Sequence, residues 1–176
     1  MTALSLPART GDRPETGPSV PHVQLSQNSP DQLREQLKQW MTDHLDGAVI
    51  RPSEISEPGS LAFFLDDTLP PAGVVLLPPR LNAEFVHVHP DGSLHLALSQ
   101  EDQHELIAKG WGERHPLYSP TINVVMLYGP RTDDELEIAK TVLTASYRYA
   151  TGHDLGTPAA EATGEPRPGT PDAVTG

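Results

Sequence analysis

The sequence contains no cysteine, so disulfide bonds, thiolate metal ligands and a catalytic thiol are all excluded. Basic residues are scarce as well: 12 Lys and Arg stand against 24 Asp and Glu, which leaves a formal net charge of −12. A polyanion does not generally hold nucleic acid or an anionic membrane surface, so we expect neither as a partner.

Long hydrophobic runs are also missing. No stretch of about 18 apolar residues offers a membrane-spanning helix. The N-terminus MTALSLPARTGDRPE lacks the basic and apolar regions of a signal peptide, and we therefore expect a cytoplasmic protein. The sequence has no P-loop, no GxGxxG and no GxSxG motif, which argues against nucleotide binding.

Apolar periodicity is absent from residues 1–28 and 152–176, which are rich in Pro, Gly, Thr, Ser, Ala and Glu. Segments of this composition bury too little apolar surface to offset the entropy lost on ordering. We therefore predict two disordered tails around a single domain over residues 29–151.

Within that domain, apolar spacing and turn residues predict three helices and five strands. The order α-β-β-β-β-α-β-α predicts an α+β domain with a mixed, mostly antiparallel sheet and helices packed mainly on one face. The predicted helices lie within 29–47, 99–110 and 132–151, and the strands lie within 60–65, 73–78, 85–98 (two strands) and 123–129.

The predicted hairpin, FVHVHPDGSLHLAL, carries His87, His89 and His95. Its loop length decides which side chains share a face, because residues alternate between the two faces of a strand. A two-residue turn would mix two of the histidines with leucines. A three-residue loop over 91–93 pairs His89 with His95 and His87 with Ala97, and it gathers the imidazoles on one face and the apolar residues on the other. We predict this second register.

Three imidazoles on one face have three interpretations, which the residues alone leave open. They can form a catalytic, substrate-binding face with a histidine as general base, which is the preferred interpretation. They can hold one divalent metal ion through His87, His89 and His95, with an open coordination position. They can also be structural, paired with loop carbonyls on a solvated sheet face.

The glycine-rich loop KGWGERHPL is predicted to close over the histidine face. Trp111 would stack on a flat ligand, while Arg114 or His115 would contact its oxygens. Glu113, also expected at the substrate, would orient a histidine. Arg131, after the last strand, would bind an enolate or carboxylate. The sequence also allows Trp111 to pack onto the core and Arg131 to cap the neighbouring helix.

The series HVHPDGSLHLAL, KGWGERHPL, LYGPR and ASYRY resembles the luciferase-domain family over residues 84–151. The resemblance implies an oxygenase that needs no cofactor. In such a reaction a base deprotonates an electron-rich enol, the enolate reacts with O2, and the intermediate loses carbon dioxide. The implied partners are a small pyrone, phenol or polyketide-like substrate and O2. The matching positions are His87, His89, His95, Trp111, Arg114, His115 and Arg131.

Other functions remain open beside this one. A related isomerase, cyclase or decarboxylase would use the same residues without cofactor. A metal-dependent enzyme would use the three hairpin histidines as ligands. A module that binds a small molecule without chemistry would keep only the pocket.

Overall fold

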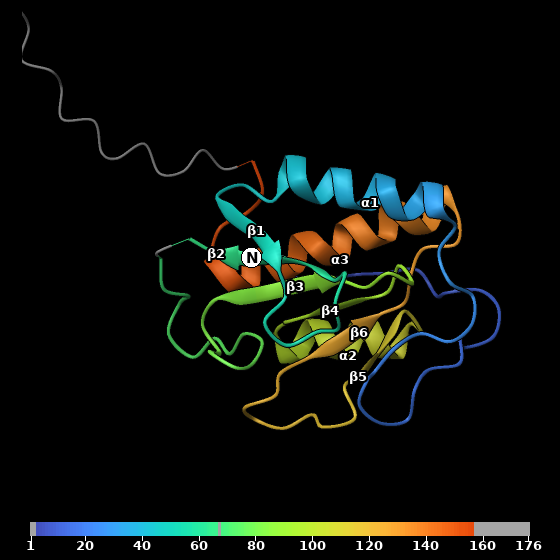
Figure 1. Cartoon of the computed structure of the whole chain (residues 1–176), viewed down its shortest axis with the longest axis horizontal. Coiled ribbons are helices and arrows are strands. Elements are labelled where there is room, and N and C mark those ends of the chain that lie inside the picture. The colour runs from blue at the N-terminus through green and yellow to red at the C-terminus, as the bar shows by residue number, and fades with distance from the viewer. Residues whose placement is uncertain (1–2, 67, 157–176) are drawn as a thin grey trace, which may run out of the picture.

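The computed structural model describes residues 3–66 and 68–156. This part of the chain contains three α-helices and six β-strands (Figure 1). Their bounds are α1 Asp31–His44, β1 Ala48–Pro52, β2 Leu61–Leu65, β3 Glu84–Val88, β4 Leu94–Leu96, α2 Gln100–Ala108, β5 Gly112–Arg114, β6 Val125–Leu127 and α3 Asp133–Thr151.

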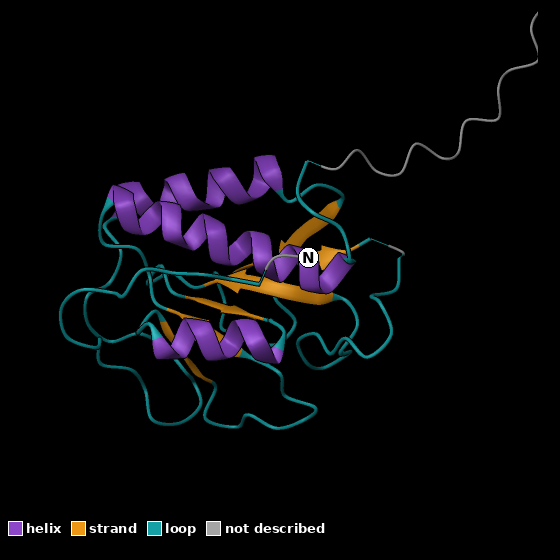
Figure 2. Cartoon of the chain, turned by 180° about the vertical axis from the view of Figure 1, so that it is seen from behind, coloured by secondary structure: helices purple, strands orange, loops and turns teal. Residues whose placement is uncertain are grey.

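The six strands form one sheet in the order β1-β2-β3-β4-β6-β5, and every neighbouring pair is antiparallel. Leu37 of α1, Leu106 of α2 and Leu143 of α3 belong to one buried apolar cluster, together with side chains of the sheet. Helix α1 lies beside α3 (Figures 1 and 2). The predicted α+β class is confirmed.

Alternation along the strands gives the sheet one apolar face and one mixed face. The side chains that face the helices are mostly apolar, with Arg114 of the edge strand β5 as an exception, and they include Phe63, Val86, Val88, Leu94, Leu96, Val125 and Leu127. The side chains of the opposite face include Ala62, Phe64, Glu84, His87, His95, Glu113 and Met126. Full burial of one large apolar side chain stabilises the fold by about 1.5–3 kcal/mol. The apolar face therefore fixes the direction in which the histidines point.

The apolar stretch 73–78, predicted as a strand, forms none. Leu77 is buried, but its N–H donates to the Glu84 carbonyl outside any regular ladder. Pro78 and Pro79 follow it, and neither has the N–H that would extend a ladder. Strands β1 and β5 were not predicted; they lie at the two edges of the sheet and show little apolar alternation.

The segment before α1 packs against the domain, whereas the sequence analysis predicted a disordered tail over 1–28. Leu4 and Leu6 join the buried core, and the Leu4 N–H donates to the Asp102 carboxylate of α2 at 2.8 Å. The few apolar residues of this segment follow neither the helix period nor the strand period. They are buried because they pack against the surface of the folded domain, and sequence periodicity does not predict this kind of contact.

At the other end of the domain, Gly152 ends α3 with a φ of 77°, the left-handed conformation typical of a helix C-terminus. Most of the predicted C-terminal tail, residues 157–176, lies outside the described residues. No helix in the described part of the chain is both long enough and apolar enough to cross a bilayer.

A histidine cluster as the candidate functional site

The hairpin of β3 and β4 brings its histidines to the face opposite the helices. His87 pairs with His95, and the His89 N–H donates to the Ser93 carbonyl at 2.8 Å. The three-residue loop therefore spans 90–92, and its last residue has a φ of 93°. The prediction that an odd-numbered loop gathers the histidines is confirmed. The predicted pairing of His89 with His95 is wrong, because the left-handed glycine closes the loop one residue earlier than expected.

His87 is buried on this face, and its two ring nitrogens have different surroundings. Nδ1 lies 2.7 Å from Glu84 Oε1, which also accepts a 2.7 Å hydrogen bond from the Ser53 hydroxyl. Because a carboxylate only accepts, Nδ1 donates and Nε2 keeps its lone pair. A β-bulge brings Glu84 to this position, since the pairing with β2 skips Phe85 and turns Glu84 to the face of His87.

His89 is held in the same manner just beyond β3. Its Nδ1 lies 3.0 Å from Ser93 Oγ, and the Ser93 hydroxyl donates to Asp91 Oδ1 at 2.6 Å. The serine proton is directed to the aspartate, so the serine oxygen accepts from Nδ1–H. The Nε2 atom again keeps its lone pair, and it lies 3.2 Å from Nε2 of His87.

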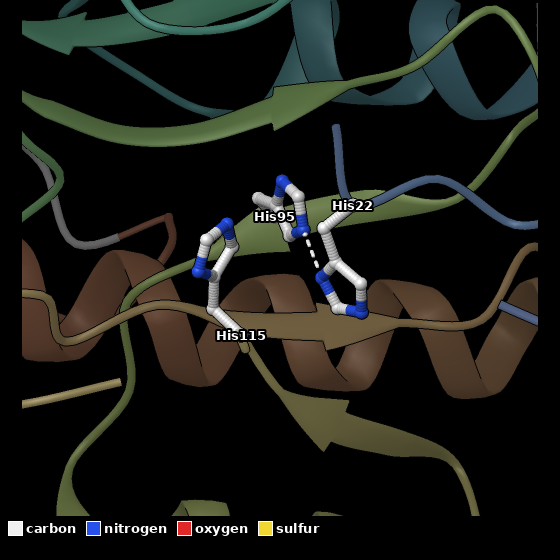
Figure 3. Close-up of side chains that lie close together, drawn as sticks. All are labelled: His22, His95 and His115. Carbon is white, nitrogen blue, oxygen red and sulfur yellow. Dashed lines mark hydrogen bonds between the residues drawn. The ribbon is translucent and has the colours of Figure 1, made fainter. Parts of the chain in front are cut away.

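His95 connects the hairpin to the N-terminal segment. Its Nδ1 lies 3.2 Å from Nε2 of His87, while its Nε2 lies 2.8 Å from Nδ1 of His22 (Figure 3). His22 Nε2 is 3.5 Å from Glu113 Oε2. With the His22 proton on the nitrogen that faces this carboxylate, His95 Nε2 donates to His22. The His95 Nδ1 atom then keeps its lone pair, like the facing atom of His87.

His115 follows β5 and completes the group of rings. Figure 3 shows that His22, His95 and His115 come from three separate segments of the chain. The centroid of the His115 ring lies 5.4 Å from that of His95 and 5.2 Å from that of His22. The Leu117 N–H donates to His115 Nδ1 at 3.1 Å. A neutral His115 therefore carries its proton on Nε2, which makes it a hydrogen-bond donor.

Burial keeps the imidazoles of His89, His95 and His115 in their neutral form. It lowers the pKa of His89 to about 3, with nearby His87 and His22 adding to the effect. Burial, followed by the surrounding histidines, lowers the pKa of His95 well below its usual range. Burial also lowers the pKa of His115 to about 4. Neutral rings offer lone pairs as well as protons at neutral pH, and both are needed for proton transfer or metal binding.

A cavity of about 240 Å³ opens above the cluster. His22, His87, His89, His95 and His115 all contribute to its lining. Its apolar walls include Val20, Val23, Ile55, Leu77, Leu117 and Ile122. An apolar cavity with a few convergent polar groups is typical of a small-molecule site, and this one lies just below the usual range of about 300–1,000 Å³.

Trp111 and Arg114, predicted to contact the ligand, lie outside the lining of this cavity. Trp111 is buried in the core and its Nε1–H donates to the Pro7 carbonyl. The Arg114 guanidinium lies over the Tyr118 ring, 4.7 Å from its centroid. The predicted loop is in fact the short strand β5, and alternation along it turns only its middle residue, Glu113, toward the histidine face.

Arg131, predicted near the substrate, instead connects α3 to the N-terminal segment. Its guanidinium donates to both carboxylate oxygens of Glu135, to Gln27 and to the Thr10 carbonyl. Glu113 is likewise outside the cavity lining, but it faces His22 as an orienting carboxylate would. Burial alone would raise the pKa of Glu113, yet the contact with His22, together with neighbouring hydroxyl and guanidinium groups, holds it at about 2.

His22 was predicted to lie in a tail without a role in the site, and no role was predicted for Glu84 or Ser93. Glu84 reaches the site through a β-bulge, and Ser93 through a side-chain hydrogen bond across the turn. His22 reaches it because a segment distant in sequence packs against the hairpin. One signal was available for Glu84, because a charged residue at the start of a largely apolar strand needs a partner when it is buried.

The fold and the cluster together define an α+β domain with a histidine-lined small-molecule cavity on the sheet face opposite its helices. The family model described as "Luciferase domain" matches residues 82–146, which run from just before β3 into α3. The chain is 32% identical over 170 residues to a protein named luciferase from Armillaria ostoyae, a match that covers 86% of this chain and 64% of that protein.

Two further relatives carry the same name. The Armillaria mellea luciferase is 29% identical over 170 residues, with 86% of this chain and 63% of that protein covered. The Neonothopanus nambi luciferase is 37% identical over 84 residues, with 44% of this chain and 32% of that protein covered. No solved structure shows significant similarity to the chain. Over residues 82–146 the chain is therefore similar to the luciferase-domain family, and it spans somewhat less than two thirds of the length of the Armillaria proteins.

Proposed function

We propose that this protein is an oxygenase that acts on a small enolisable molecule, such as a hydroxypyrone or a phenol. The observation that supports this most is the convergence of five neutral or hydrogen-bonded histidines on one apolar cavity. The match to the luciferase-domain family adds to it, because the resemblance to that family implies an oxygenase. An apolar wall suits a planar ring, while the imidazoles suit its hydroxyl and carbonyl groups.

In the proposed reaction, a ring nitrogen that keeps its lone pair, on His87 or His89, accepts the proton of the enol hydroxyl. The resulting oxyanion accepts a hydrogen bond from His115 Nε2–H. With a hydroxypyrone, the enolate carbon forms a bond to O2, and the peroxide attacks the ring ester carbonyl. The bond from that carbonyl to the ring oxygen breaks, and the released oxygen takes back the proton held by the histidine. The O–O bond and the bond between the carbonyl carbon and the former enolate carbon then break together, and carbon dioxide leaves. The substrate is oxidised and O2 is reduced, with one oxygen atom staying in the product and the other leaving in the carbon dioxide.

The test is to measure O2 consumption and carbon dioxide release with triacetic acid lactone and a panel of other hydroxypyrones and phenols. We expect the two gases in equal amounts, and a His89→Ala rate at least about 100-fold lower. His104→Ala, on the exposed side of α2, is the matched control and should keep the full rate. Product formed without O2 consumption would favour a cofactor-free isomerase instead. Ligand binding without any turnover across the panel would contradict an enzymatic role.

A further inference from the structure

We infer that His87, His89 and His95 together bind one divalent transition-metal ion, with a coordination position left for a ligand in the cavity. This deepens the proposed function, on which it rests, because it names the point at which the enol oxygen binds. The three rings offer ligand nitrogens that all lie within 4.8 Å of one another. Since they come from one rigid hairpin, their relative positions are set by the strand register rather than by mobile loops.

The spacing of the nitrogens matches a shared ion. His87 Nε2 lies 3.2 Å from His89 Nε2 and 3.2 Å from His95 Nδ1. An imidazole nitrogen lies about 2.0–2.1 Å from a bound zinc ion, so two ligands about 100° apart at the ion are separated by about 3.2 Å. The observed separations are therefore those of neighbouring ligands in a tetrahedral or slightly compressed site.

The protons of the three rings are directed away from the shared point. His87 donates outward to Glu84 and His89 to Ser93, and His95 donates to His22 when the His22 proton lies on the nitrogen that faces Glu113. Three lone pairs that face one another at this distance repel unless a cation lies between them. A divalent ion would use all three at once, whereas a single proton could serve only one pair.

Each ring is also oriented by a carboxylate, directly or through one intermediate group. Glu84 contacts His87, Asp91 reaches His89 through a serine, and Glu113 reaches His95 through His22. Histidines that bind metals usually donate their other N–H to a carboxylate, a carbonyl or water, which fixes the ring and raises its basicity. Three buried or partly buried acidic groups would also balance the charge of a divalent ion.

A second group, His22, His95 and His115, has ligand atoms at similar separations, but its contacts point to a different role. The 2.8 Å between His22 and His95 is an ordinary hydrogen-bond length. Nδ1 of His115 already accepts the Leu117 N–H. His22 therefore orients His95, and His115 contacts the substrate. The ion is held by His87, His89 and His95.

The donor set indicates the class of metal. Three neutral imidazoles without a thiolate suit Fe²⁺, Co²⁺, Ni²⁺, Cu²⁺ or Zn²⁺, and they do not suit Mg²⁺ or Ca²⁺, which prefer oxygen ligands. With the ion bound, the enol oxygen becomes a further ligand on the cavity side. The hairpin histidines would then hold the ion in place of the base role given to His87 or His89 above. The ion would lower the pKa of the enol hydroxyl bound to it, so that the proton passes to solvent, and it would stabilise the enolate charge.

The test uses the full chain without a polyhistidine tag, stripped by a chelator and then titrated with Co²⁺, whose visible absorption reports its coordination. We expect saturation at one Co²⁺ per chain, with the strong bands of a four- or five-coordinate ion. Addition of triacetic acid lactone should shift these bands, because its enol oxygen enters the coordination sphere. Absence of saturable uptake by the wild-type chain would overturn the inference without reference to any variant.

Variants locate the ion. His89→Gln should weaken Co²⁺ binding by more than about 100-fold, and Ser93→Ala, which removes the partner of His89 Nδ1, by about 10–100-fold. His104→Gln is the matched control and should bind like the wild type. Far-ultraviolet circular dichroism checks that each variant is folded. Co²⁺ binding that is unchanged in both site variants would contradict the assignment.

Turnover separates this inference from the proposed function. Undiminished O2 consumption by the metal-free chain would overturn the metal inference and leave the oxygenase proposal standing. Binding of Co²⁺ and of the pyrone, with no turnover under any metal, would do the reverse. Activity that is lost on stripping and restored by one added transition metal would support both.

Discussion

The imidazole of His22 stacks on that of His95, with ring centroids 5.0 Å apart and planes inclined by 20°, although 73 positions separate the two residues. Both side chains are buried. The segment that precedes α1 therefore completes a site that the hairpin begins. Because His22 lies between His95 and Glu113, it acts as a positioning residue for the His95 ring.

Two substitutions of His22 test this positioning role. His22→Phe keeps an aromatic ring on His95 but removes the acceptor of its Nε2–H, while the amide oxygen of His22→Gln can still accept. We expect His22→Phe to lower kcat by about 10–100-fold with little change in KM, and His22→Gln to keep more of the rate. Steady-state kinetics on an active hydroxypyrone checks this. A His22→Phe enzyme as fast as the wild type would contradict the role.

Trp111 is predicted to be structural, because its indole is buried and its N–H donates to the Pro7 carbonyl. Trp111→Phe should lower the free energy of unfolding by about 1–2 kcal/mol, through the lost hydrogen bond and the smaller ring. Its kcat and KM should remain at wild-type values, since the side chain is outside the cavity lining. Urea unfolding and kinetics measure the two effects. A raised KM with an unchanged free energy of unfolding would indicate instead that Trp111 contacts the substrate.

Arg131 is also predicted to stabilise the fold rather than bind substrate. Burial alone would raise the pKa of Glu135, but hydrogen bonds from the Arg131 side chain and backbone outweigh it and lower the pKa. A lowered carboxyl pKa contributes stability above the ordinary value of 4.5, and this contribution is lost as the pH falls below it.

Arg131→Gln tests this interpretation. It should lower the free energy of unfolding at pH 7 by about 1–2 kcal/mol, because a partly exposed, bidentate ion pair is lost. The difference from the wild type should stay constant above pH 4.5 and shrink as the pH falls below it toward the lowered pKa of Glu135 in the wild type. Urea unfolding across this range gives the comparison, with Lys140→Gln as a control on an exposed pair. A difference that does not depend on pH would contradict the role of the charge.

The regular parts of the fold were predictable from the sequence because local physics decides them. Ser99 and Thr132 cap their helices, and each accepts a hydrogen bond from a backbone N–H three residues later. The face shared by the histidines followed from alternation, because only an odd-numbered loop separates them from the leucines. The exact pairing did not follow, because loops over 90–92 and 91–93 give the same separation of polar from apolar residues.

The rest of the site depends on contacts between segments distant in sequence, or on irregular backbone. His22 lies in a stretch without apolar periodicity, and its position depends on its contact with His95 of the folded sheet. Glu84 reaches His87 through a bulge, which breaks the alternation that sequence patterns use. Trp111 and Arg114 were placed wrongly because a three-residue edge strand looks like a loop in the sequence.

The buried imidazoles predict that the metal-free protein loses stability in mild acid. In the folded chain the pKa of His89 is about 3, whereas its ordinary value is 6.5, and the pKa of His95 is lowered as well. As the pH falls, the unfolded chain therefore binds protons before the folded chain does, and unfolding becomes easier. The contribution of these rings is complete above about pH 6.5 and declines progressively toward pH 3.

Urea unfolding of chelator-treated protein at pH 7.5, 6.5 and 5.5 measures this decline. These pH values lie above the pKa values of most carboxyl groups, so carboxyl titration contributes little. The free energy of unfolding should fall between pH 6.5 and 5.5 in the wild type. His89→Gln should fall less steeply, because its amide takes up no proton in the unfolded chain. His104→Gln, whose ring is exposed, should follow the wild type. Equal slopes in the wild type and in His89→Gln would mean that the His89 ring is protonated in the folded chain, which would also remove the lone pair that both proposals require.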